Sequence, residues 1–302
     1  MYWSTTFDPR SPHHRRMWHY ESGNPLSVAQ LVSLGSLDAR TAALLWLLVE
    51  RHSSFIVSGP TDPTPGIGKT TTLNALLGFL PAGTSLVYTT GMYEDFEFKD
   101  QVTPETTCVL CNEVSDHLPI YMWGRVARSF LRLPEEGFAV ATSCHADTIT
   151  DVLSMLARDL RLPAEIVGRL GVVVNIGLVG RLWPPRRRFL TANLILPADH
   201  AACGAAVATR FGASLLPLAT WDAASDDFTP ATPQALNELA TLLGLPAADL
   251  LATLDRRTTH IATLSEGRGV GPRAMRDSVD EFIEAERQMA GGEAQGEASN
   301  DQ

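Results

Sequence analysis

The chain has 302 residues, of which 45% are hydrophobic, and it carries a formal net charge of −10. A chain of this size can bury a core without disulfides, and its four cysteines are too few for a disulfide scaffold. The negative charge gives no support to a nucleic-acid partner. No apolar run approaches the roughly 18–20 residues of a membrane span, so no transmembrane segment is expected, and a reducing, cytoplasmic location is the default.

The first half of the chain predicts strands that alternate with helices. Residues 1–24 are polar and without a period, which predicts an irregular arm. Ser27 opens a capping-box pattern and a short helix, and Ser36 is expected to cap a second helix that ends near His52. Strands are then predicted at 54–59, 85–90, 106–112 and 138–143, and helices at 70–80, 121–131 and 147–160. This alternation indicates a parallel sheet flanked by helices.

The second half of the chain has a different pattern. Residues 171–179 and 189–197 predict two strands around the basic segment RLWPPRRR, which would extend the sheet in antiparallel fashion. From Pro233 the pattern becomes helical, and the acidic end at 289–302 has too few apolar residues to predict order.

Between the first strand and the next helix lies SGPTDPTPGIGKTTT, which is typical of a phosphate-binding loop. Such a loop needs backbone N–H groups at a helix N-terminus, a lysine for the β- and γ-phosphates and a hydroxyl for Mg²⁺. GIGKTTT supplies them, but G-x-x-x-x-G-K-[ST] fits only if residues 62–65, DPTP, are an insertion. The alternative is a degenerate loop that no longer binds nucleotide. The residues predicted to bind ATP are Gly59, Gly66, Ile67, Gly68, Lys69, Thr70 and Thr71.

Three later segments follow the loop along the chain. CVLCNE ends an apolar strand in Glu113, SCHADT contains His145, and the acidic segment YEDFEF comes directly after a predicted strand. Together with the loop, these segments make the chain resemble the type II/type IV secretion, pilus-assembly and archaellum ATPases, a RecA-like P-loop NTPase family. The resemblance runs from about residue 25 to residue 287.

The resemblance implies an α/β fold, with a RecA-like P-loop core, an antiparallel β extension and a C-terminal helical module. The domain boundaries that we expect are an irregular arm at 1–24, a nucleotide-binding domain at 25–230, the helical module at 231–288 and a disordered acidic tail at 289–302.

The resemblance also implies roles for single residues. Glu113 would orient Mg²⁺ or its water, and Thr70 would supply the hydroxyl ligand of the metal. His145 would sense the γ-phosphate, unless it is a satisfied core or interface histidine. In YEDFEF, Glu94 is favoured over Asp95 and Glu97 as the carboxylate that activates the attacking water; a solvated loop is the alternative.

The chain departs from the family pattern in four ways. The segment KDQVTPET lacks the arginine expected near Pro104, and the spacing from Glu113 to His145 is long. The arginine expected two residues after Glu113 is replaced by Ser115, and most of the family's N-terminal domain is missing, which makes a hexamer less certain. Such arginines stabilise phosphate charge across subunit interfaces. Candidates to replace them lie on a predicted helix, where a solvated face explains them equally well: Arg125, Arg128 and Arg132.

For two further features we favour a structural interpretation over a functional one. The residues 186–188, three consecutive arginines, predict a charged hairpin tip, with contact to a partner or to acidic lipid as the alternative. Cys108 and Cys111 lie on one predicted strand, where alternation separates their thiols, so both are expected to be buried and structural rather than zinc ligands.

The favoured function is that of an ATP-binding and ATP-hydrolysing assembly or secretion ATPase that uses ATP and Mg²⁺. It would form a homo-oligomer such as a hexamer and act on a membrane platform protein of a pilus or secretion machine. It would be cytoplasmic, and peripheral at the inner face of the membrane through such partners. The alternatives are an ATP-binding regulatory or partner subunit with little hydrolysis, and a P-loop small-molecule kinase, against which SCHADT and the C-terminal helices argue.

Overall fold

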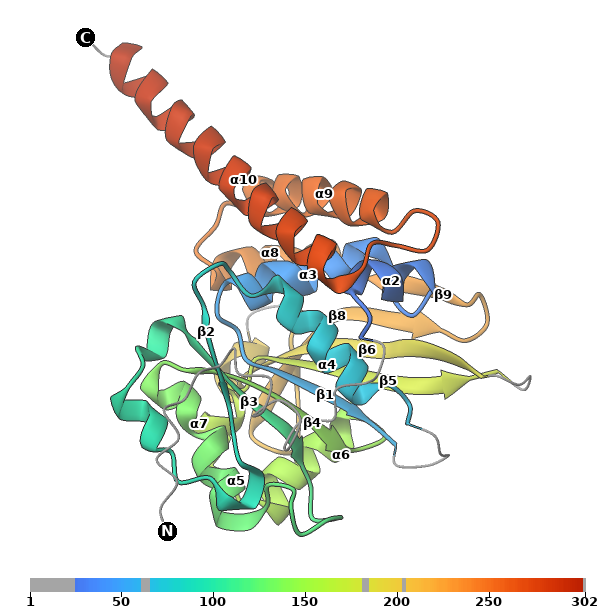
Figure 1. Ribbon diagram of the computed structural model, residues 1–302. Coiled ribbons are helices and arrows are strands. Elements are labelled where there is room, and N and C mark those ends of the chain that lie inside the picture. Colours follow the sequence, from blue (N-terminus) through green and yellow to red (C-terminus); the bar gives the residue numbers. More distant parts are fainter. Residues whose placement is uncertain (1–24, 61–65, 181–184, 203–204, 301–302) are drawn as a thin grey trace.

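The computed structural model describes residues 25–60, 66–180, 185–202 and 205–300. The predicted arm at 1–24 and the predicted DPTP insertion therefore lie outside the described residues. Within the described ranges, one sheet lies between two layers of helices (Figure 1).

The described sheet has nine strands in the order β2-β3-β4-β1-β5-β6-β8-β7, with β9 paired to β8. The parallel strands are β1 (Phe55–Gly59), β2 (Ser85–Tyr88), β3 (Thr107–Val114), β4 (Ala139–His145) and β5 (Val172–Val179). The antiparallel strands are β6 (Arg186–Pro197), β7 (Val207–Ala208), β8 (Ala213–Asp222) and β9 (Asp227–Pro230). The prediction of a parallel sheet with an antiparallel extension is thus confirmed.

Each face of the sheet packs against its own set of helices and has its own hydrophobic core. One face carries α2 (Val28–Ser33), α3 (Ala39–Glu50), α4 (Lys69–Leu76), α8 (Pro233–Leu242), α9 (Ala247–Leu264) and α10 (Pro272–Asn300). The other face carries α5 (Gly124–Leu131), α6 (Ile149–Ser154) and α7 (Ala164–Val167), and α6 continues into a π-helical segment at Met155–Asp159. The central strands are covered on both faces, which is why they are apolar almost throughout.

Helix caps show where local sequence decides the structure. The predicted capping box at α2 is present, because Ser27 Oγ accepts from Gln30 N at 3.1 Å and Gln30 Oε1 accepts from Ser27 N at 3.0 Å. The predicted cap of the next helix is wrong. Asp38, not Ser36, caps α3, with its carboxylate accepting from Thr41 N at 3.1 Å. An ionised carboxylate beside free N–H groups is stabilised by the helix dipole.

One buried arginine links the C-terminal helices α9 and α10 to α3 through ion pairs. Arg257 on α9 is 3% exposed; it pairs with Glu50 of α3 at 2.5 Å and with Glu286 of α10 at 2.6 Å. Its guanidinium also lies 4.5 Å from the ring of Trp46. Beyond this contact α10 remains helical to Asn300, where composition predicts disorder; the alanine and glutamate residues of that segment are good helix formers.

These elements make an α/β core with an antiparallel β extension and a C-terminal helical module, as the sequence predicts. The boundaries assigned to these parts stay predictions. In the described part of the chain no single helix is long and apolar enough to cross a membrane. Only α8 and α9 taken together, with a bend of 107° between them, meet that criterion, and their apolar residues contribute to the core.

Candidate functional site

A buried polar network holds together the carboxyl ends of the central strands. Asn175 on β5 donates from Nδ2 to Ser58 Oγ on β1 at 2.9 Å and to the carbonyl of Ala146 at 3.3 Å. Ser143 on β4 donates to the carbonyl of Asn112 on β3 at 2.8 Å. In open α/β sheets ligands bind outside these strand ends, so the network forms the floor of a candidate site.

The loop between β1 and α4 meets this floor with free backbone donors. Gly68 is the N-cap of α4 and has φ 103°, a left-handed conformation that favours glycine. No side chain of the described residues caps α4, and its first intrahelical bond runs from Thr72 N to the Gly68 carbonyl at 2.8 Å. The N–H groups of Lys69, Thr70 and Thr71 have no partner within the helix, so the N-terminus of α4 is suited to an anion.

Close packing determines the positions of two predicted loop residues without polar side chains, Gly59 and Ile67. A Cβ on Gly59 would lie 2.2 Å from Ile67 Cδ1 and 2.6 Å from the Ile176 carbonyl oxygen, so only glycine fits there. Ile67 is buried against this position, whereas a Cβ on Gly66 would meet nothing within 4 Å. Gly59 and Ile67 therefore hold the loop in place, and the space beside Gly66 is open.

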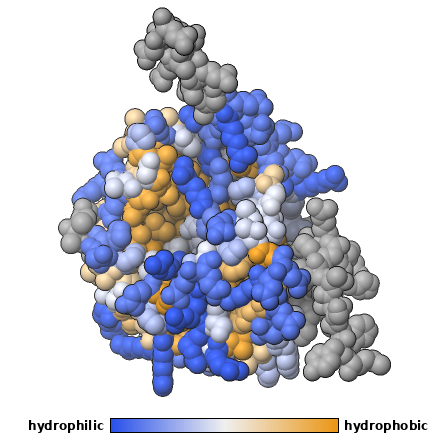
Figure 2. Space-filling model, turned by 90° about the vertical axis from the view of Figure 1, so that its left-hand side faces the viewer, coloured by the Kyte–Doolittle hydropathy of each residue, from blue (hydrophilic) through white to orange (hydrophobic). Residues whose placement is uncertain are grey.

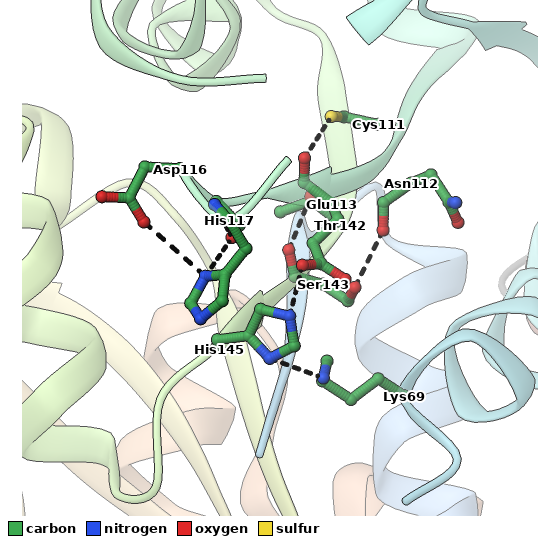
Figure 3. A network of polar contacts seen from close by, with 10 residues as sticks. Lys69, Cys111, Asn112, Glu113, Asp116, His117, Thr142, Ser143 and His145 are labelled. Carbon is green, nitrogen blue, oxygen red and sulfur yellow. Dashed lines mark hydrogen bonds and ion pairs between the residues drawn. The ribbon is translucent and has the colours of Figure 1, made fainter. Parts of the chain in front are cut away.

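Three of the predicted site residues meet in one chain of contacts (Figure 3). Lys69 Nζ lies 3.0 Å from His145 Nδ1, and His145 Nε2 lies 2.6 Å from Glu113 Oε1. Lys69 begins α4, His145 ends β4 and Glu113 is the next-to-last residue of β3, so three separate elements supply the group. The sequence predicts this meeting because parallel strands end at the same edge of a sheet.

The contacts define the protonation pattern of the group. An ammonium can only donate, so His145 Nδ1 accepts from Lys69, and the proton of a neutral ring lies on Nε2, facing Glu113. Partial burial lowers the pKa of Lys69 from its ordinary value, and the negative charge of Glu113 opposes that shift. Lys69 is thus a cation held at a cost of desolvation, a property common at binding sites.

The third predicted catalytic residue, Glu94, lies in the loop that follows β2. Strand β2 pairs with β3, the strand that carries Glu113, and is three strands from β1. The carboxylate of Glu94 accepts from Thr90 N at 2.8 Å and from Phe96 N at 2.9 Å, so it orders its own loop. Asp95 likewise accepts from Glu97 N at 3.1 Å. The described hydrogen bonds of Glu94 thus lie within its own loop, and its catalytic role stays a prediction.

A polar cleft of about 640 Å³ opens beside His145. His117 lines it; its ring centroid lies 4.5 Å from that of His145, and its Nδ1 is 2.8 Å from Ser115 Oγ. Asp116, Asp151 and Asp159 add three carboxylates to the lining. The sequence reasoning missed His117, whose only signal was its place in the loop four residues after the candidate glutamate.

The residues fit a nucleoside triphosphate better than a metal alone. Among the described residues no group of three or more His, Cys, Asp or Glu side chains is arranged to hold a metal ion. Thr70 and Glu113 would hold Mg²⁺ only together with phosphate oxygens, as P-loop proteins do. The cysteines are not ligands either: Cys108 and Cys111 are free and lie in separate cores, and burial raises the pKa of each to about 12.

The described residues define an α/β protein in which a mixed sheet lies between two helix layers, and β1, the loop after it and α4 form a strand–loop–helix unit whose helix N-terminus is suited to an anion. Residues 21–91 match the family described as type II/IV secretion system protein. This range includes β1, the described part of the loop, and α4. The resemblance to the type II/IV secretion system proteins that the sequence predicts is thus confirmed over residues 21–91.

Two individual proteins are also similar to the chain. Over 56 residues it is 46% identical to the uncharacterized protein MJ0900 of Methanocaldococcus jannaschii, a match that covers 18% of this chain and 9% of that protein. A solved structure of the VirB11 ATPase from the Brucella suis type IV secretion system, in complex with sulphate, is 23% identical, with a TM-score of 0.36, over 50% of this chain and 51% of that one. The chain therefore spans only a small part of its curated relative and about half of the solved one.

Proposed function

We propose that the protein binds ATP with Mg²⁺ and hydrolyses it as an assembly or secretion ATPase of the type II/type IV secretion and pilus family. One observation carries the proposal: the contact chain Lys69–His145–Glu113 lies beside the uncapped N-terminus of α4. This places a cation, backbone donors and a carboxylate around one point, which is what phosphoryl transfer to water requires.

The residues have separate tasks in the proposed reaction. The N–H groups at the start of α4 bind phosphate oxygens, and Lys69 moves its ammonium from His145 to the β- and γ-phosphates. Thr70 and Glu113 hold Mg²⁺, which would neutralise charge that develops on the phosphates. His145, once released by Lys69, has a free Nδ1 that can report the presence of the γ-phosphate.

Steady-state ATP hydrolysis tests the proposal. Lys69→Ala and Glu113→Gln should each lower turnover at least about a hundredfold, since each removes a group acting on the transferred phosphate or its metal. Matched controls are Lys99→Ala and Glu135→Gln, because these residues form exposed ion pairs with Glu136 at 2.6 Å and with Arg132 at 3.0 Å. Turnover that survives both site changes would refute the proposal.

A second candidate is an ATP-binding regulatory or partner subunit with little hydrolysis. It is favoured by Glu94, whose two carboxylate oxygens are engaged by backbone N–H groups of its own loop. To activate water, Glu94 would have to give up these bonds. This candidate predicts ATP binding with negligible turnover at any protein concentration, so hydrolysis that rises with concentration would exclude it.

We further propose that the chain forms a homo-oligomer, with a membrane platform protein as a partner at the inner face of the membrane. Its support is an exposed group that we name the loop patch, made of Met92, Tyr93, Leu118 and Ile120. The two loops that carry it are joined by a bond from Met92 N to the Ile120 carbonyl at 3.3 Å. Hydrophobic residues also gather in patches on the face seen in Figure 2, and clustered exposed apolar residues often mark protein contacts.

A further inference from the structure

The three consecutive arginines at the start of β6 do not have the same surroundings. Arg186 and Arg188 both pair with Asp226, in the turn between β8 and β9. Arg188 donates from Nε to Asp226 Oδ1 at 2.9 Å and from Nη2 to Oδ2 at 3.1 Å, and Trp221 Nε1 adds a bond of 3.0 Å. Two of the three guanidinium groups therefore share one carboxylate, that of Asp226.

Arg187, between them, reaches the loop before α4 instead. Side chains alternate along a strand, and Arg187 donates from Nη2 to the carbonyl of Gly66 at 3.2 Å. Its Cδ would lie 3.4 Å from a Cβ placed on Gly68. Arg187 is exposed, and no carboxylate of the described residues forms an ion pair with it. An uncompensated guanidinium thus lies directly over the candidate phosphate site.

A cavity of about 180 Å³ lies at this place. Gly66, Gly68, Thr71 and Arg187 supply polar groups to its lining, which also includes apolar residues such as Leu26. None of its lining residues is shared with the polar cleft beside His145. The loop therefore has two sides, one facing Lys69, His145 and Glu113, and the other facing Arg187.

We propose that Arg187 is a nucleotide ligand supplied by the same chain, which binds the phosphates that are not transferred. This inference rests on the proposed function. The fork of a guanidinium matches phosphate oxygens, and its bond to the Gly66 carbonyl can be exchanged for one to a ligand. Because Lys69 and Glu113 mark the γ-phosphate side, Arg187 on the other side contacts groups present in both ATP and ADP.

Calorimetric titration with Mg·ADP and with a Mg-bound non-hydrolysable ATP analogue tests this inference. Arg187→Ala should weaken both affinities in parallel, by about tenfold or more, as expected for loss of a charge-assisted hydrogen bond. In the hydrolysis assay KM should rise while kcat stays near the wild-type value, because the lost contact is the same before and after transfer. Arg187→Lys keeps the positive charge but lacks the two-pronged guanidinium, so its nucleotide affinities should lie between those of wild type and those of Arg187→Ala.

Arg186→Ala is the matched control. It removes the same charge from the same hairpin, and Arg188 still holds Asp226, so affinities should stay close to wild type. Equal affinities for Arg187→Ala and wild type would overturn the inference. The inference would also be overturned if Arg186→Ala lost as much nucleotide affinity as Arg187→Ala does, or if Arg187→Ala lost affinity for the ATP analogue but not for ADP. The proposed function fails separately, if wild type binds neither nucleotide or if Lys69→Ala binds both as wild type does.

Discussion

At the scale of single residues, Lys69 shows how the candidate site stores an unfavourable charge. Burial disfavours its ammonium, and the ring of His145 and the carboxylate of Glu113 are described groups that offset this cost. A folded-state pKa below the unfolded one means that the protonated lysine lowers stability in full below the folded pKa. This cost shrinks as pH rises above the folded pKa and is gone above the unfolded pKa. Nucleotide phosphates would remove the same cost by supplying negative charge.

The first prediction follows from this charge. In the absence of nucleotide, Lys69→Met should raise the melting temperature at neutral pH, because an apolar side chain of similar length replaces a partly buried cation. The same variant should lose the stabilisation that added Mg·ATP gives to wild type. Thermal melts with and without nucleotide measure both effects. Lys99→Met, at an exposed ion pair, should show neither change, and a destabilised Lys69→Met would contradict the argument.

The sequence predicts which residues meet in the site where they lie at the ends of parallel strands. It does not predict contacts that form because an antiparallel strand returns beside its neighbour. Glu113 and His145 follow apolar strands, so their meeting with Lys69 could be inferred from the sequence. Arg187 reaches the loop only because β6 returns beside β5, and no spacing along the chain encodes that contact. Glu94 was placed by resemblance alone, and the backbone N–H groups that hold it have no sequence signature.

At the scale of elements, the turn between β8 and β9 acts on β6 through one carboxylate. Asp226 binds two arginines of β6 and the indole of Trp221 on β8. The hydrogen bonds from Arg188 lower the pKa of Asp226 to about 2. The charge of Asp226 thereby holds the strand that presents Arg187 to the loop.

Asp226→Asn should reveal this link through pH. A lowered pKa means that the carboxylate stabilises the fold above its unfolded pKa of about 3.9 and loses that effect as pH falls toward its folded pKa. At neutral pH the variant should melt below wild type, since Arg188 is buried and loses its counter-charge. The difference should shrink between about pH 4 and pH 2. A constant difference in melting temperature over this range would show that charge is not the cause.

Element types were largely predictable, and their ends were not. Apolar runs located all five parallel strands, and glycine with lysine located α4. The helix expected at 147–160 instead becomes π-helical after Ser154, because tertiary packing overrides local preference. The strands β7, β8 and β9 went unpredicted, since their pairing depends on β6 rather than on their own pattern.

At the scale of the whole molecule, the proposed homo-oligomer leads to a prediction about its mass in solution. Mass determination in solution should show a larger species with a non-hydrolysable ATP analogue than without it. The double variant Leu118→Glu, Ile120→Glu places charges in the loop patch and should stay monomeric in both states while keeping its nucleotide affinity. Association that persists in this variant would remove the loop patch from the proposed interface.

The edge strands of the sheet limit the ways in which copies of the chain can associate. One border is β2, with four residues; the other consists of β7, with two, and β9, with four that end in Pro230. Short borders and a proline offer few backbone groups to an added strand. Growth by continuous sheets, the route to fibres, is therefore disfavoured in this fold. Contacts between copies would be left to side chains, which makes them sensitive to salt and to single substitutions in a way that strand addition is not.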